Sequence, residues 1–183
     1  MNIVIGITGA SGTIYARRLI ERIIDLNQEH KIYVVFSEYG EQVAMYECEF
    51  DSIKNTPVEF VSNKTMFTTL ASGSSEIDAM VVVPCTASTL GRIATATSNN
   101  VITRTADVML KERRKLIIAL RETPLTLTHI ENMRSCTLSG AVVMPLSPSF
   151  YSHPSSIVEL VDTQVERIIS LLGLSDNSRY VFG

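Results

Sequence analysis

The fold is decided by residues 2–26, NIVIGITGASGTIYARRLIERIIDL. An apolar run, Asn2–Thr8, leads into the glycine-rich turn Gly9-Ala-Ser-Gly12, and a helical pattern follows from Thr13 to Leu26. A buried strand, a tight turn and a helix in this order predict the first unit of a parallel α/β sheet. The turn would direct backbone N–H groups and the positive end of the helix at an anion, and Ser11 adds a hydroxyl donor. The stretch therefore predicts a phosphate site.

The same alternation of strands and helices continues to residue 172. Val- and Ile-rich runs predict strands, and apolar residues at helical spacing predict helices. The predicted strands are 32–36, 79–83, 115–120 and 141–144, and the predicted helices are 41–48, 88–97, 104–113, 126–136 and 155–172. Residues 51–75 are polar and turn-rich, and residues 173–183 form a patternless tail. We expect one domain over 1–183, with a five-stranded parallel sheet covered by helices on both faces.

Composition excludes several classes of protein. The 183 residues are 45% hydrophobic and 19% charged, which is typical of a globular domain. A net charge of −3 gives no electrostatic signature of nucleic-acid or anionic-membrane binding. Three cysteines without paired spacing suggest neither a disulfide framework nor a zinc site, and we expect no metal. The expected protein is a soluble cytosolic one.

Ligands of open parallel sheets bind outside the carboxyl ends of the strands. The five predicted strand ends are Gly9–Gly12, Ser37, Pro84–Thr89, Arg121-Glu122 and Pro145–Tyr151. Four of these are rich in Ser, Thr or Gly, which suits phosphate and ring binding. At the fourth, the Glu122 carboxylate beside Arg121 could accept a proton near a phosphate leaving group.

Two simpler interpretations compete with this one. TGASG, residues 8–12, resembles the start of short-chain dehydrogenases, and Glu38 could imitate a ribose-binding acid. However, none of the tyrosines is followed by Lys four residues later, so the proton-transfer pair of those enzymes is missing. The basic residues from Arg104 to Lys115 could likewise form an ordinary solvated helix face.

Six motifs nevertheless resemble one family, the UbiX flavin prenyltransferases. They are GITGASG (6–12), LASGS (70–74), PCTASTL (84–90), RTADVMLKERRKLI (104–117), RETPL (121–125) and GAVVMPLSPSFYSHP (140–154). The resemblance implies a Rossmann-like or flavodoxin-like three-layer fold and a homo-oligomer, commonly a dodecamer, with active sites at subunit junctions. It also implies transfer of a dimethylallyl group from dimethylallyl monophosphate to N5 and C6 of reduced FMN, without a metal. The product would serve a UbiD-type decarboxylase.

The resemblance also assigns roles to residues. The FMN-binding residues would be Gly9, Ala10, Ser11, Ser37, Thr86, Ser88, Thr89 and Arg104. The dimethylallyl phosphate would be bound by Ser72, Lys111, Arg121, Tyr151 and Arg167. The catalytic residues would be Glu122, Lys111, Arg121 and Glu47. Taken alone, Ser11 and Ser37 could be simple helix caps, and Arg167 and Glu47 ordinary surface charges.

Two features depart from the family pattern. The chain has no Trp, so Met66 or Phe67 would replace a family tryptophan, and Tyr180 a C-terminal aromatic residue. The family's Ser-Met-Lys in the third loop is here Thr86-Ala-Ser88, so a cation at the flavin edge is lost. Cys85 in that loop is interpreted as a small buried filler. Two alternatives stay open: an FMN-dependent decarboxylase of cysteine-ended substrates, and an FMN carrier without catalytic activity.

Overall fold

A computed structural model describes residues 1–26 and 29–174, and it contains one six-stranded sheet with every neighbouring pair parallel. The strand order is β3-β2-β1-β4-β5-β6. The strands are β1 Asn2–Ile7, β2 Lys31–Phe36, β3 Glu59–Phe60, β4 Ala79–Cys85, β5 Lys115–Leu120 and β6 Val142–Pro145. This order is that of the doubly wound Rossmann fold, with its switch point between β1 and β4. The predicted fold class is confirmed.

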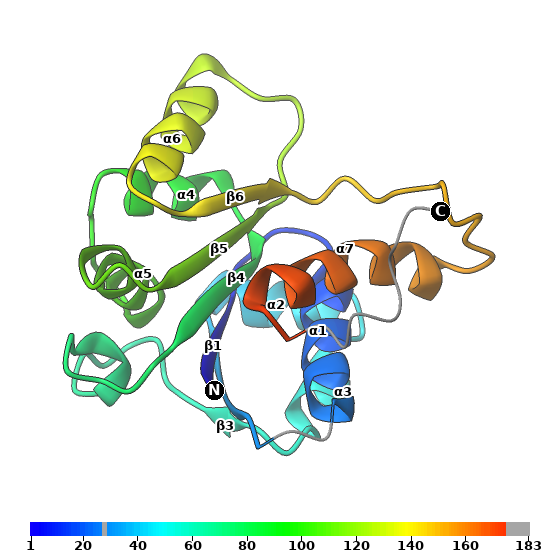
Figure 1. The fold of residues 1–183 in the computed structure, drawn as a ribbon, viewed down its shortest axis with the longest axis horizontal. Coiled ribbons are helices and arrows are strands. Elements are labelled where there is room, and N and C mark those ends of the chain that lie inside the picture. The colour runs from blue at the N-terminus through cyan, green and yellow to red at the C-terminus, as the bar shows by residue number, and fades with distance from the viewer. Residues whose placement is uncertain (27–28, 175–183) are drawn as a thin grey trace.

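Helices cover both faces of the sheet (Figure 1). The α-helices are α1 Thr13–Asp25, α2 Glu38–Tyr46, α3 Phe50–Lys54, α4 Ala87–Ala94, α5 Val101–Lys111, α6 Leu127–Leu138 and α7 Ile157–Leu172, and a 3-10 turn spans Thr69–Ala71. Helices α1, α3 and α7 pack on one face, where Ile3, Ile5 and Ile7 point. Helices α4, α5 and α6 pack on the other, against Val4, Met80 and Val82. Burial on both faces explains why the central strands β1, β2, β4 and β5 are apolar along most of their length.

The first and last helices are joined by ion pairs as well as by apolar contacts. Arg18 on α1 donates two hydrogen bonds to Asp162 on α7, at 2.8 and 2.7 Å. One turn further on, Arg22 donates to Glu166 at 2.7 Å. These bonds to Asp162 raise the pKa of Arg18, although burial alone would lower it. The α1–α7 pair therefore covers one face of the sheet as a joined unit.

The structure differs from the sequence prediction between residues 51 and 75. This segment contains α3, the edge strand β3 and the 3-10 turn, so the sheet has six strands rather than five. Helix α5 begins at Val101 because Asn100 and Thr103 form a reciprocal cap. Helix α7 ends, as predicted, at Gly173, whose φ of 82° terminates the helix. Tyr180 and the rest of 175–183 lie outside the described residues.

Candidate functional site

A small cavity opens at the carboxyl ends of β1 and β4, where ligands of this fold bind. Its volume is about 160 Å³. It is lined by Thr8, Gly9, Ser37, Tyr39, Thr86, Ser88, Thr89, Arg92, Asn100 and Ile102. Five of these residues, Gly9, Ser37, Thr86, Ser88 and Thr89, were assigned to FMN from the sequence. The structure brings them together, so we call this space the switch-point cavity.

The turn after β1 is held close to its neighbours. A Cβ on Gly9 would lie 2.5 Å from Cβ of Tyr39, so the turn can approach α2 only with glycine at this position. The Thr8 hydroxyl donates to the carbonyl of Pro84 at 2.7 Å and accepts from the N–H of Thr86 at 2.9 Å. These bonds fix the first turn against the loop that opens α4. Ala10 lies buried in the turn.

The start of α4 presents hydroxyl groups and a cation to the cavity. Thr86 caps the helix, since its Oγ1 accepts from the Thr89 N–H at 3.1 Å and lies 3.0 Å from Thr89 Oγ1. One helical turn on, Arg92 Nη1 lies 3.4 Å from Ser88 Oγ. Among the described lining residues, Arg92 is the single basic one and none is acidic. Sequence reasoning missed Arg92, although its spacing of four from Ser88 places both on one helix face.

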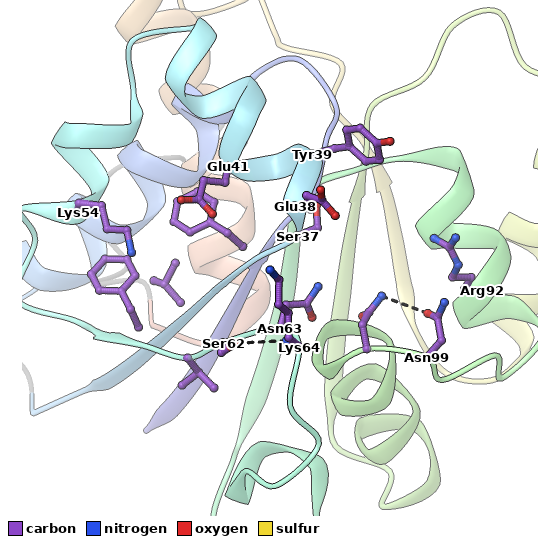
Figure 2. Close-up of a pocket in the computed structure, with 15 residues that line it drawn as sticks. Ser37, Glu38, Tyr39, Glu41, Lys54, Ser62, Asn63, Lys64, Arg92 and Asn99 are labelled. Atoms are coloured by element: carbon purple, nitrogen blue, oxygen red, sulfur yellow. Dashed lines mark hydrogen bonds between the residues drawn. The ribbon is translucent and has the colours of Figure 1, made fainter.

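A larger cavity of about 690 Å³ continues from the first on the β2–β3 side (Figure 2). Ser37, Tyr39, Arg92 and Asn100 line both cavities and form the waist between them. Ser37 also caps α2, accepting from the Gly40 N–H at 2.9 Å. We call the larger space the side chamber. It was not foreseen from the sequence.

The start of α1, predicted as a phosphate site, already holds an anion from the chain itself. The Glu47 carboxylate accepts from the Gly12 N–H at 2.9 Å, the Thr13 N–H at 2.8 Å and the Thr13 hydroxyl at 2.6 Å. Burial alone would raise the pKa of Glu47, but these bonds and one from the Ser11 hydroxyl hold it below its ordinary value. Glu47 therefore caps α1 as a carboxylate. Its carboxylate oxygens already accept the helix N–H groups that a phosphate would need.

Arg121 and Glu122 follow β5 at the same edge of the sheet. The Arg121 N–H donates to the Cys85 carbonyl at 2.9 Å, which holds this residue beside the loop that opens α4. Burial raises the pKa of Tyr15, and the positive charge of Arg121 nearby partly offsets that rise. Both Arg121 and Glu122 are exposed. They are available to a ligand that extends from the switch-point cavity.

Ser72 and Lys111 lie toward the opposite, amino edge of the sheet. Lys111 ends α5, just before β5 begins, and it forms an ion pair with Glu112 beside Gly73. Six residues of β5 separate Lys111 from Arg121, which is about 20 Å along the strand. One chain therefore does not bring these two predicted phosphate ligands to one phosphate.

Arg104 lies between the two edges on α5. Its guanidinium donates to the Ala71 carbonyl at 3.2 Å and to the Asp107 carboxylate at 2.7 Å. It therefore holds the segment around the 3-10 turn against α5, and it is not among the residues that line the switch-point cavity.

Tyr151 and Arg167 occupy exposed positions beyond the sheet. Tyr151 is 81% exposed in the loop between β6 and α7, and this loop leaves the sheet beside β5, where the Leu146 N–H donates to the Leu120 carbonyl at 2.8 Å. Arg167 lies on the exposed side of α7. Their roles in phosphate binding stay predictions.

Three other predicted features can be placed. Cys85 is fully buried, as predicted, and burial raises the pKa of its thiol far above the ordinary value. Met66 is 40% exposed and Phe67 completely exposed, so in a single chain neither lies against the switch-point cavity. Within residues 1–26 and 29–174, no helix is both long and apolar enough to cross a bilayer.

Comparisons with known proteins agree with this fold. A family model described as Flavoprotein matches residues 1–169. The flavin prenyltransferase UbiX of Methanocaldococcus jannaschii is 41% identical over 182 residues, which cover 98% of this chain and 97% of that protein. The crystal structure of AnUbiX (PadA1) with FMN and dimethylallyl pyrophosphate has a TM-score of 0.90 at 34% identity, covering 100% and 98% of the two chains. A dodecameric FMN-dependent UbiX-like decarboxylase from Escherichia coli O157:H7 also has a TM-score of 0.90, at 28% identity over the whole of both chains.

Proposed function

We propose roles in binding and catalysis for the residues at the carboxyl edge of the sheet. The chain belongs to the Flavoprotein family and is a flavin prenyltransferase of the UbiX type. The acceptor is reduced FMN, and residues 1–183 form a single flavin-binding domain. The dimethylallyl group of dimethylallyl monophosphate is joined to N5 and C6 of the flavin. The observation that carries the proposal is the position of the switch-point cavity: it lies one strand away from Arg121 and Glu122.

The residues of the switch-point cavity fit a flavin phosphate. Ser37, Thr86, Ser88 and Thr89 supply hydroxyl groups, and Arg92 supplies the positive charge that the third loop lacks at Ser88. Gly9 lines the β1 side of the cavity, and Ala10 and Ser11 follow it in the same turn, where they would support the phosphate site. A cavity of about 160 Å³ is smaller than most ligand pockets, so it encloses the phosphate end and leaves the ring to extend toward β5.

The residues around the ring then act on the leaving group and the proton. Breaking the allylic C–O bond leaves its electron pair on the departing phosphate, and Arg121 and Lys111 stabilise that charge without a metal. Ser72, Tyr151 and Arg167 bind the same phosphate. Glu122 accepts the proton released when the new bonds to the flavin form. Glu47 acts as a positioning residue, because its carboxylate accepts hydrogen bonds from Gly12 and Thr13 and so fixes the turn after β1.

The separation of Lys111 from Arg121 supports an active site at a junction between copies of this chain. A neighbouring copy would supply Ser72, Lys111 and the fully exposed Phe67 to the edge that carries Arg121. In that neighbouring copy, Arg104 would support the segment that presents Ser72 and Phe67. Exposed apolar side chains on α6, Leu127, Ile130 and Leu138, offer a surface for such packing. We infer a homo-oligomer, with a dodecamer as its expected size, located in the cytoplasm. Its product passes to a UbiD-type decarboxylase.

The deciding experiment is anaerobic. The purified protein is mixed with FMN, dithionite and dimethylallyl monophosphate in the presence of a chelator, and the mass of the released flavin is measured. We expect the mass of FMN plus one five-carbon prenyl unit, and loss of this product in Glu122→Gln but not in the variant Asp25→Asn, at the exposed end of α1. Tightly bound but unmodified FMN, with either the monophosphate or the diphosphate donor, would instead support the carrier alternative.

A further inference from the structure

The side chamber is larger than the switch-point cavity, and FMN with its phosphate in the switch-point cavity does not fill it. Its volume of about 690 Å³ falls within the range of small-molecule sites, about 300–1,000 Å³. It joins the switch-point cavity at the waist formed by Ser37, Tyr39, Arg92 and Asn100. A ligand that begins in one cavity can therefore continue into the other.

The chamber lies where the doubly wound fold binds the second half of a dinucleotide. In a sheet of this strand order, a dinucleotide crosses the switch point, with its pyrophosphate at the centre and one nucleotide on each side. The chamber occupies the β2–β3 side, and Glu38 directly follows Ser37 at the end of β2. An acidic residue after the second strand accepts hydrogen bonds from ribose hydroxyls in such sites.

The lining changes character along the chamber. Val34, Phe36, Phe60 and Val61 form an apolar end, and the Phe36 and Phe60 rings are stacked with centroids 6.5 Å apart. Lys54 stands over this group, 4.1 Å from the Phe60 centroid. Figure 2 shows Arg92 and Asn99 facing Ser37 and Glu38 across the open space, with Asn63 and Lys64 near its lower side. Arg92 therefore lies at the waist, Glu38 lies beside it, and the apolar side chains line the far end of the chamber.

We propose that the side chamber binds the adenylate half of FAD, with the flavin half in the FMN position. The pyrophosphate would lie at the waist against Ser37 and Arg92, and the ribose hydroxyls would donate to Glu38. The adenine would pack on Val61 and the edge of the Phe60 ring, beside Lys54 and within reach of the Asn63 amide. This inference rests on the proposed FMN site, and it makes FAD a second flavin ligand of the chain.

Charge in the chamber fits this ligand. Lys54, Lys64 and Arg92 outnumber Glu38 and Glu41, so the chamber carries an excess of one positive charge. Arg92 has no carboxylate partner among the ion pairs of the described residues, and Lys64 has none there either. Both can therefore pair with a pyrophosphate.

The test is a set of calorimetric titrations of the flavin-free full-length protein with FMN and with FAD. We expect FAD to bind at least as tightly as FMN. Glu38→Ala and Lys64→Ala should each weaken FAD about tenfold while changing FMN less than about twofold, because they remove charge-assisted bonds that only the adenylate half makes. Asp25→Ala, at the exposed end of α1, should change neither affinity.

The outcomes separate the two proposals. If FMN binds and FAD binds a hundredfold more weakly, the chamber does not accept an adenylate group, and the inference falls while the proposed function stands. Equal losses of FMN and FAD in Glu38→Ala would place FMN itself in the chamber and also overturn the inference. If neither flavin binds, both proposals fail.

Discussion

An active site shared between two copies of the chain can be tested by mixing two inactive variants. Lys111→Ala removes a positive charge from the amino edge of one copy, and Glu122→Gln removes the proton acceptor from the carboxyl edge. Each variant alone should lose about a hundredfold or more in prenylation rate, which is typical for a charge-stabilising or an acid–base residue. Because about 20 Å of β5 separates the two edges, each site would draw Lys111 and Glu122 from different copies.

Co-expression of the two variants should therefore restore activity. If copies assemble at random in equal numbers, about one quarter of the junctions of a symmetric oligomer combine an intact Lys111 with an intact Glu122. We expect about a quarter of the wild-type rate, measured as prenylated flavin per subunit, for tagged oligomers purified with both variants present. Oligomers of either variant alone serve as controls. A mixed oligomer no more active than those controls would show that both residues act from one copy and would refute the shared site.

Three further predictions concern the flavin end of the site. Gly9→Ala would place a Cβ 2.5 Å from Cβ of Tyr39, so it should weaken FMN binding about tenfold and destabilise the fold by about 1–3 kcal/mol. The control is Gly91→Ala, whose Cβ would meet only the movable Asn132 amide. This variant should keep its FMN affinity in calorimetry. Arg92→Ala should weaken FMN about ten- to hundredfold by removing a charge-assisted bond. Lys31→Ala, at the exposed amino end of β2, is the control that should leave the affinity unchanged, and equal affinities in both variants would place the phosphate elsewhere. Glu47→Ala should lower the free energy of unfolding by about 1–3 kcal/mol at neutral pH. The pKa of Glu47 is lower in the folded than in the unfolded state, so its contribution to stability is present above the ordinary glutamate pKa of about 4.3 and disappears as pH falls through the folded value. The unfolding free energies of wild type and variant should therefore converge in acid. A difference that stays constant with pH would contradict the capping role.

The sequence predicted the central sheet well and its margins poorly. Runs such as Ala79–Val83 and Lys115–Leu120 are buried on both faces, so their continuous apolar character identifies them as strands. β3 has only Glu59 and Phe60, too few residues to show any periodicity. The start of α5 could have been found from the spacing of Asn100 and Thr103, which forms the reciprocal cap.

At the site, the sequence identified strand ends but not what fills them. Ser37, Thr86 and Thr89 line the switch-point cavity because parallel strands bring their carboxyl ends to one edge. The carboxylate of Glu47 was assigned to catalysis, and only the structure shows that it binds Gly12 and Thr13. The separation of Lys111 from Arg121 was equally hidden, because a motif gives spacing along the chain and not which copy supplies each residue to a site.

The pairing of α1 with α7 has a consequence for synthesis of the chain. Helix α1 leaves the ribosome early, yet the apolar face that it shares with β1 is covered by α7, whose last residue lies 147 positions after Asp25. At about 5–20 residues per second, the nascent chain carries that face uncovered for roughly 7–30 s. Ile20, Ile23 and their neighbours are fully buried in the finished protein, and during this interval they are a binding surface for a chaperone. The apolar face of α1 and β1 therefore stays open to aggregation until the last helix, and not only the first, has been translated.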